Sequence, residues 1–242
     1  MTNMTPSTVS ERKLTKAIQA AIGAHQDGIL GPASAVDLAA ALGADCWPLT
    51  IQLYSQPVIV CKDITVSNPG KGTKYFANSI SGSFSYLKKP CSILVNRGEV
   101  LCASACHAWL GQPETVLYRL EDGRFGMKRC LSADELPDRI RWAVGGMGLL
   151  EMYNPTAEGF TGTYADVVRR TNHTILGVKN NMVYLIYAKS MNDAAVNTLC
   201  RDKLQLDYAV MLDGGHVAAI NGEESFAKIN TSQVQYYMIQ GV

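Results

Sequence analysis

From about residue 45 onward the chain alternates short apolar runs with glycine-containing turns. The segments PVIVCKDITV, SILVNRGEVLCAS, TVLYRLEDGRFGMKRCL and MVYLIYA are rich in β-branched and aromatic residues, a composition typical of strands and hairpins. Within two of these segments, NRGE and EDGR are turn signals. This pattern predicts a domain built around a substantial sheet.

A helical period of apolar residues is rarer in this part of the chain. Its clearest example is SMNDAAVNTLCRDKLQL, where Ser190 and Asp193 are spaced as a capping box and one face carries Ala195, Val196, Leu199 and Cys200. This helix would lie between two predicted strands, MVYLIYA and YAVML. A strand–helix–strand unit of this kind predicts a mixed α/β or α+β domain.

The first 44 residues have a different, helical pattern. TVSERKLTKAIQAAIG predicts a helix with apolar residues along one face, and Pro32 suits the first turn of a second helix. The predicted fold class is therefore α+β (mixed α/β), with a large mixed sheet, few helices and a small N-terminal helical hairpin. We divide the chain into a helical unit, 1–44, and a main domain, 45–242.

Composition and charge exclude several classes of protein. Of the 242 residues, 47% are apolar and 18% are charged, so the chain can build a core. The formal net charge of +1 does not favour a nucleic-acid partner. The sequence has neither a signal-peptide pattern nor an apolar run long enough to span a bilayer. We therefore expect a cytoplasmic chain with no membrane partner, which would leave the cell only by lysis or within an assembled particle.

The cysteines are irregularly spaced and odd in number, which favours reduced thiols over a disulfide framework. The segment CASACH places Cys102, Cys106 and His107 close together, but no second pair of ligands matches them. We therefore expect buried thiols and neither a metal nor a cofactor, with metal binding as the alternative. The seven cysteines are Cys46, Cys61, Cys91, Cys102, Cys106, Cys130 and Cys200.

In the segment AVMLDGGHVAAI an apolar run ends in an acid, two glycines and a histidine. We expect Asp213 at the end of a strand, Gly214 and Gly215 in a tight hairpin, and HVAAI as the returning strand. Ligands commonly bind where strands of α/β sheets end, and glycine N–H groups can face an anionic oxygen. The alternative is a plain hairpin with a solvated aspartate.

Four segments resemble, in their order, the markers of the phosphodiester glycosidase family: NSISGSFSY, WAVGGMGLLEM, NHTILGV and LDGGH. The family's markers are N-G-G/S-F-F, G-x-P-L-hydrophobic, R-T-A-hydrophobic-G and L-D-G-G-G-S. The resemblance covers about residues 46–242. The matching residues are Gly82, Ser83, Phe84, Gly146, Leu149, Leu150, Thr174, Gly177, Leu212, Asp213, Gly214 and Gly215.

Four departures from the family pattern bear on the chemistry of the site. Ser81 stands where the family has asparagine, and His173 stands where it has arginine. His216 and Val217 stand where it has glycine and serine. Histidine is a weaker and pH-dependent partner for a phosphate than arginine. The site is therefore either retuned for its chemistry or reduced to binding.

The resemblance implies a glycosidase that hydrolyses a sugar-1-phosphodiester, with a cell-wall or exopolysaccharide polymer as a substrate class. It implies that Asp213 is the acid/base or nucleophilic carboxylate, and that His173 and His216 are phosphate donors or proton carriers. No second carboxylate stands out, although Glu151 and Asp166 lie near the motifs. The implied substrate-binding residues are Ser81, Gly82, Thr174, Gly214 and Gly215.

The N-terminal segment resembles one unit of the peptidoglycan-binding repeats of phage lysins and bacterial wall hydrolases. This resemblance implies wall binding, and a structural hairpin docked on the main domain is the alternative. For the main domain, the alternatives are a non-catalytic module for a sugar phosphate or wall polymer, and a structural component of a phage particle or lysis apparatus. The residues that match the repeat are Ile18, Gln19, Asp27, Gly28, Gly31 and Pro32.

Overall fold

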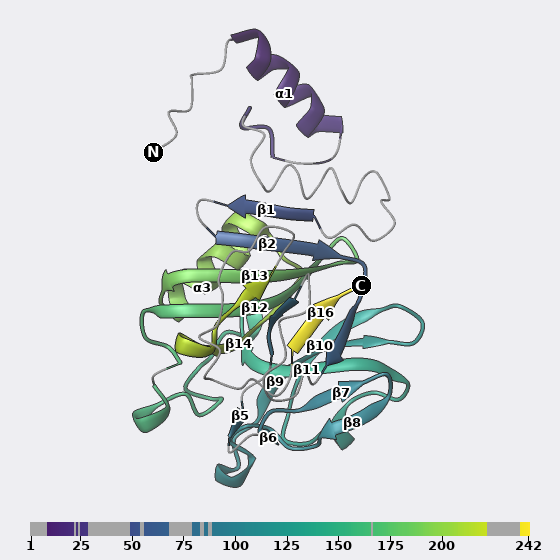
Figure 1. Ribbon diagram of the computed structural model, residues 1–242, viewed down its shortest axis with the longest axis vertical. Coiled ribbons are helices and arrows are strands. Elements are labelled where there is room, and N and C mark those ends of the chain that lie inside the picture. The colour runs from purple at the N-terminus through teal and green to yellow at the C-terminus, as the bar shows by residue number, and fades with distance from the viewer. Residues whose placement is uncertain are drawn as a thin grey trace.

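A ten-stranded antiparallel sheet forms the centre of the molecule (Figure 1). The computed structural model describes residues 9–21, 23, 25–28, 49–53, 56–67, 79–82, 85–86, 89–165, 167–221 and 238–242. Across the sheet the strands follow in the order β1 (Leu49–Leu53), β2 (Gln56–Cys61), β13 (Met182–Met191), β12 (Thr171–Lys179), β14 (Tyr208–Gly214), β11 (Ile140–Gly148), β7 (Leu94–Asn96) and β8 (Glu99–Cys102). Two further strands extend it, β9 (Glu114–Leu120) against β11 and β10 (Phe125–Cys130) against β9.

Two smaller sheets and a few helices complete the described part of the chain. A four-stranded sheet has the order β15 (Ile220–Asn221), β4 (Ser79–Ser81), β16 (Met238–Gly241) and β3 (Ile64–Ser67), and β5 (Ser85–Tyr86) pairs with β6 (Lys89–Pro90). The α-helices are α1 (Val9–Ala21) and α3 (Asp193–Thr198), and α3 continues into a π-helical turn, η5 (Leu199–Leu204). Short 3-10 helices are η1 (Ala108–Leu110), η2 (Ala133–Glu135), η3 (Leu150–Met152), η4 (Gly162–Tyr164) and η6 (Gly215–Val217). None of the described helices has the length and apolar character needed to cross a bilayer.

The large sheet is buried on both faces, which explains why its central strands are almost continuously apolar. Along β2, Val58 belongs to one hydrophobic cluster and Ile59 to another, because successive side chains point to opposite faces. The first cluster includes Val196 of α3 and Leu204 of η5. The second includes Ile80 of β4, so it fills the space between the two larger sheets. Strands covered on both sides lose the alternation of apolar and polar residues.

The predicted α+β class with a mixed sheet is wrong. Every strand pair in the described sheets is antiparallel, and the described chain is mainly β. The strand–helix–strand unit exists, with α3 and η5 between β13 and β14, and these two strands run in the same direction. However, β12 lies between them and pairs antiparallel with both. Because β12 lies between them, β13 and β14 do not form the parallel pair that the local pattern suggests.

The N-terminal helical hairpin is not evident in the described residues. They contain one helix there, α1, and the second predicted helix and the boundary at residue 44 lie outside them. The end of α1 is held locally, since the buried Gln19 side chain donates to Asp27 (2.7 Å) and accepts from the Gly28 N–H (2.9 Å). These three residues are part of the repeat-like pattern, and their contacts explain it as a helix-to-turn connection.

Helix α3 begins two residues later than the capping box predicted. Asn192, rather than Ser190, is the N-cap, and its side chain accepts a hydrogen bond from the Ala195 N–H (2.9 Å). Ser190 instead has a left-handed backbone conformation at the end of β13. Asparagine and serine are both good N-caps, so sequence spacing alone could not choose between them.

The predicted turn at NRGE is confirmed, because Arg97 and Gly98 both have positive φ values, 50° and 81°, between β7 and β8. A second turn of this kind joins β12 to β13, where Asn180 and Asn181 have φ values of 50° and 63°. Two consecutive left-handed residues match the right-handed twist of the flanking strands. These hairpins fix the register of the strands that carry the candidate site.

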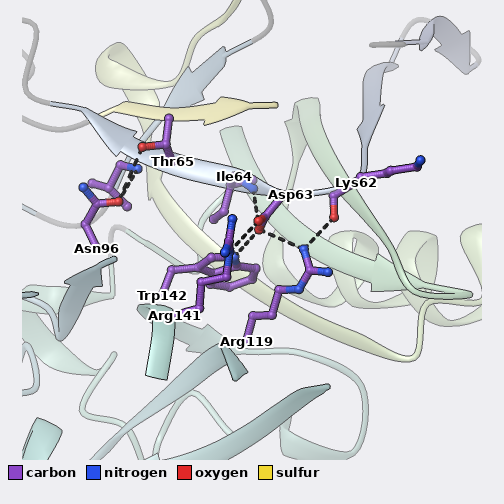
Figure 2. Close-up of polar contacts among 9 residues, drawn as sticks. Lys62, Asp63, Ile64, Thr65, Asn96, Arg119, Arg141 and Trp142 are labelled. Carbon is purple, nitrogen blue, oxygen red and sulfur yellow. Dashed lines mark hydrogen bonds and ion pairs between the residues drawn. The ribbon is translucent and has the colours of Figure 1, made fainter. Parts of the chain in front are cut away.

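The buried carboxylate of Asp63 links the four-stranded sheet to the ten-stranded sheet (Figure 2). Asp63, between β2 and β3, accepts hydrogen bonds from the indole of Trp142 and from Nε of Arg141, both at 2.6 Å. It also forms an ion pair with Arg119 at 3.0 Å, and its backbone is hydrogen-bonded in both directions to Val242. One residue therefore joins two strands of the large sheet, β9 and β11, to the C-terminal residue.

Gly146 is required where β11 meets β14. A Cβ at this position would lie 2.5 Å from the Met211 carbonyl oxygen and 3.2 Å from a methyl group of Leu212. Because a strand carbonyl cannot move without disturbing the β11–β14 pairing, we expect Gly146→Ala to lower the free energy of unfolding by roughly 1–3 kcal/mol. The measurement is chemical denaturation.

The matched control is Gly111→Ala. A Cβ at Gly111 meets no atom within 4 Å, but φ is +70°, so this change costs only backbone strain, roughly 1 kcal/mol. A smaller loss of stability in Gly146→Ala than in Gly111→Ala would contradict the steric argument.

Candidate functional site

A β-bulge presents Asp213 near the end of β14. In the pairing of β12 with β14, Ile175 lies opposite Met211 but His173 lies opposite Gly214. Two residues of β14, Leu212 and Asp213, therefore occupy the space opposite Thr174 alone. Bulges of this kind re-aim side chains and are common beside active sites. The half-buried Asp213 is thus set apart from the regular alternation of its strand.

Two buried hydroxyl groups, those of Thr174 and Ser81, lie next to this bulge. Thr174 Oγ1 lies 3.0 Å from the main-chain carbonyl of Asp213 and 3.2 Å from that of Ser81, and it donates to these oxygens. Ser81 Oγ accepts the N–H of Ala219 (3.0 Å) and lies 3.4 Å from Thr174 Oγ1. Both side chains are fully buried. Thr174 therefore contacts the backbone of Asp213, and Ser81 contacts Thr174 rather than Asp213 itself.

The two glycines do not form the predicted hairpin. Gly214 has φ of −132° and Gly215 has φ of +65°, and the chain then makes the 3-10 turn η6 and enters the small sheet as β15. Of the predicted strand HVAAI, Ile220 alone lies in β15. The two glycines therefore let the chain cross from the large sheet to the small one directly after Asp213.

Gly214 also permits the close approach of β12. A Cβ there would lie 2.7 Å from the Asn172 carbonyl oxygen and 3.0 Å from His173 Nδ1. The Gly214 N–H donates to Oδ1 of Asp213 (2.8 Å). This bond orients the carboxylate, and it uses the amide that the sequence had suggested for a substrate anion.

His173 lies next to Gly214 but is fully buried. Its Nε2 donates to the Met191 carbonyl (2.9 Å), since a carbonyl oxygen can only accept. Burial lowers the pKa of His173 below its ordinary value, although its main-chain hydrogen bonds and the charge of Asp193 act in the opposite direction. The imidazole is therefore neutral at neutral pH, so a role as a phosphate-binding cation is disfavoured.

This burial predicts how stability depends on pH. Because the folded-state pKa of His173 lies below the unfolded value of about 6.5, the unfolded chain binds the proton more readily, and stability falls as the pH drops below about 6.5. His173→Gln keeps a donor for Met191 but cannot titrate. We expect it to reduce the slope of unfolding free energy against pH between pH 6.5 and 5, as measured by urea denaturation. An unchanged slope would assign the acid sensitivity to other groups.

Two cysteines and a second acid form a cluster that the charge of Asp213 reaches. Cys91 and Cys106, 15 residues apart, have sulfur atoms 3.7 Å from each other. The Asp213 charge acts to raise the pKa of both thiols, although the pKa of Cys91 is lowered overall by its hydrogen bond with Cys106. Glu114 accepts hydrogen bonds from the N–H of Cys106 (3.2 Å) and the hydroxyl of Ser92 (2.8 Å).

Burial raises the pKa of Glu114 to about 8, against the opposing effect of its hydrogen bonds from Ile93, Ser92 and Cys106. A protonated carboxyl group is the form that a general acid needs. However, Glu114 is only 1% exposed, so it holds the Cys106 segment in place rather than contacting a substrate. Glu114 therefore acts as a positioning residue for the segments that carry Cys91 and Cys106.

The remaining predicted residues have less defined places. Gly82 is buried directly after β4, and His216 lies in η6, where the structure describes its backbone. Glu151 is exposed in η3, and Asp166 lies outside the described residues. Within the described residues, no cluster of three His, Cys, Asp or Glu side chains is arranged to hold a metal ion.

Sequence reasoning missed Cys91, Cys106 and Glu114 as neighbours of Asp213. CASACH drew attention to Cys106, but it suggested Cys102 and His107 as its partners. Cys102 instead donates to the Ser104 carbonyl (3.7 Å), and His107 Nδ1 lies 2.8 Å from the Glu158 carbonyl. Neither Glu114 nor Cys91 carries a local signal, because their contacts with the Cys106 segment join residues that are distant in sequence.

Comparison with solved structures shows what fold this is. The chain is similar to the catalytic domain of zebrafish N-acetylglucosamine-1-phosphodiester alpha-N-acetylglucosaminidase, a structure in which the pro-peptide auto-inhibits the domain (TM-score 0.57, 15% identity, 80% of this chain and 81% of that chain). It also matches a hypothetical protein from Synechocystis (TM-score 0.49, 10% identity, 76% of this chain and 59% of that chain). No family model matches the sequence, and no curated protein matches it. The first likeness establishes a distant relationship of fold.

Proposed function

We propose that this chain is a glycosidase that hydrolyses a sugar-1-phosphodiester. The observation that carries the proposal is the position of Asp213, a half-buried carboxylate on a β-bulge at the end of a central strand. The fold that it shares with the zebrafish glycosidase domain supports this assignment. The sequence motifs that resemble the phosphodiester glycosidases meet at this bulge through Ser81 and Thr174.

The proposed hydrolysis requires one correctly positioned carboxylate. Water attacks the anomeric carbon, the bond from this carbon to the phosphate oxygen breaks, and the phosphate leaves with the bonding electrons as a stable monoester anion. Because the leaving group needs little protonation, a strong general acid is less important than in hydrolysis of an ordinary glycoside. In this proposal Asp213 either removes the proton from the attacking water or first attacks the carbon itself.

The other groups act mainly by positioning. Thr174, which also bonds to Ser81, fixes the backbone of Asp213, and the Gly214 N–H orients its carboxylate. His173, neutral and bonded to Met191, fixes the strand beside the glycine rather than supplying positive charge. We retain His216 as the proposed proton carrier and the main chain of Gly82 and Gly215 as proposed substrate contacts.

The experiment uses an alkyl phosphodiester of N-acetylglucosamine 1-phosphate, the sugar named for the zebrafish domain. Release of the alkyl phosphate is followed by phosphorus NMR, and the anomeric form of the released sugar by proton NMR. The matched control is the alkyl glycoside of the same sugar, which lacks the phosphate. We expect cleavage of the phosphodiester alone. Failure to cleave phosphodiesters of glucose, galactose and N-acetylglucosamine would contradict the proposal.

A non-catalytic module that binds sugar phosphates is the second candidate, and one observation favours it. The position that carries arginine in the resembling family holds His173, which is buried and neutral here. Calorimetric binding of the uncleaved phosphodiester, without product in the NMR assay, would establish this candidate over the glycosidase.

A further inference from the structure

Two thiols in contact lie beside the candidate site, and the proposed hydrolysis does not use them. Cys91 follows β6, Cys106 lies in the segment between β8 and η1, and both are half-buried. Their sulfur atoms are 3.7 Å apart. A disulfide needs the sulfur atoms to close to about 2 Å, so a movement of about 2 Å separates this contact from a bond.

We propose that Cys91 and Cys106 are a redox-active dithiol, which a small-molecule disulfide such as oxidised glutathione converts into an intramolecular disulfide next to Asp213. This inference is independent of the proposed glycosidase activity. It assigns to the two residues a covalent modification that changes how the candidate site is held together.

The surroundings hold the two segments in register for this reaction. Glu114 accepts hydrogen bonds from Ile93, two residues after Cys91, and from the N–H of Cys106 itself. Ser92 donates to the same carboxylate. A Cβ at Gly145 would lie 2.2 Å from Glu114, so β11 packs directly against this anchor. The backbone on both sides of the pair is therefore fixed to one buried group, which holds the two segments together.

The two thiols are not equivalent. The hydrogen bond between the two thiols lowers the pKa of Cys91, against the effects of burial and of the Asp213 charge. The same hydrogen bond raises the pKa of Cys106, and burial and the charges of Glu114 and Asp213 add to this. The thiolate is the nucleophile in thiol–disulfide exchange, and we propose Cys91 as the attacking residue and Cys106 as the resolving one.

The exchange balances in two steps. The Cys91 thiolate attacks one sulfur of oxidised glutathione, a bond forms between them, and a glutathione thiolate leaves with the electron pair of the broken bond. Cys106 then loses its proton to solvent and attacks Cys91, which releases the second glutathione. The protein dithiol is oxidised by two electrons, and one oxidised glutathione is reduced to two thiols.

The other described cysteines are less suited to this reaction. Cys61, Cys130 and Cys200 are buried, and burial raises the pKa of Cys130 and of Cys200 to about 12. Cys102 donates its thiol hydrogen to the Ser104 carbonyl. Cys102 nevertheless provides a useful control, because it lies in the same tryptic peptide as Cys106.

The experiment equilibrates the folded full chain with mixtures of oxidised and reduced glutathione, blocks remaining thiols with iodoacetamide, and maps tryptic peptides by mass spectrometry. Trypsin yields peptide 89–97, which contains Cys91, and peptide 98–119, which contains Cys102 and Cys106. We expect these two peptides to be joined in oxidised wild type and in Cys102→Ser. Neither Cys91→Ser nor Cys106→Ser should give the joined peptide.

Closing this 15-residue loop should raise the thermal midpoint of oxidised wild type and of Cys102→Ser by roughly 5–10 °C. The midpoint of Cys91→Ser should not respond to oxidised glutathione, and Cys91→Ala repeats the test if the serine variant folds poorly. The proposal is overturned if excess oxidised glutathione fails to join the peptides, or if they remain joined in Cys106→Ser. A stable mixed disulfide with glutathione on Cys91 would also overturn it, because it would show that Cys106 does not resolve the intermediate.

Discussion

Asp213→Asn is expected to lower kcat for sugar-1-phosphodiester cleavage by about 100-fold or more, the usual scale of an acid–base group. The substitution is nearly isosteric, and its side-chain oxygen can still accept the Gly214 N–H that Asp213 accepts at 2.8 Å. The bulge should persist, because Thr174 bonds to the main-chain carbonyl of residue 213 and not to its side chain. The loss should therefore appear in kcat, with KM changed little, since the interaction removed is one made to the reacting atoms.

Asp207→Asn is the matched control for this measurement. Asp207 precedes the other end of β14, is exposed, and accepts the Asn180 N–H (2.9 Å) through its side chain, a bond that asparagine can also accept. It should retain wild-type kcat. Full activity in Asp213→Asn would remove Asp213 from the chemistry and leave the binding module as the better function.

The strands could be predicted from sequence because their apolar content is local information. MVYLIYA and YAVML are apolar throughout, and both became strands, β13 and β14, with a helix between them. The strand that pairs with both of them, β12, could not be predicted in the same way. The sequence favoured direct parallel pairing, whereas β12 enters between them through a tight turn at Asn180 and Asn181. Pairing choices depend on the whole sheet, and local periodicity does not contain them.

The candidate site could likewise be predicted only in part from the sequence. The motif order predicted that Ser81, Thr174 and Asp213 converge, and in the structure Thr174 contacts the main chain of both Ser81 and Asp213. The role of His173 depends on burial, which the sequence cannot report, and burial makes it neutral. Glu114 was missed since an acid at the start of an ordinary-looking strand gives no sign that three donors will surround it.

The second large effect is expected at Asp63, which links the two larger sheets (Figure 2). Asp63→Ala leaves the Trp142 indole N–H without its acceptor and removes the carboxylate that faces Arg119 and Arg141. Arg119 is mostly buried, but Arg141 is about half exposed, so solvent screens part of the loss. We expect the free energy of unfolding to fall by about 3 kcal/mol, measured by urea denaturation at pH 7. The exposed pair of Arg201 and Asp202 supplies the control, because Asp202→Ala should leave the urea midpoint unchanged.

The pH dependence of stability distinguishes the effect of the Asp63 charge from the effect of its hydrogen-bonding shape. Burial alone would raise the pKa of this carboxyl, but hydrogen bonds from Trp142 and Ile64 and the charge of Arg119 lower it overall. A folded-state pKa below the unfolded value of about 3.9 means that the charged form stabilises the fold above that pH, and that this contribution is lost as the pH falls through the folded pKa. The stability gap between wild type and Asp63→Asn should therefore be widest near neutral pH and should narrow below about pH 4. A gap that stays constant from pH 7 to pH 3 would mean that the fold depends on the hydrogen-bonding shape at this position and not on the carboxylate charge.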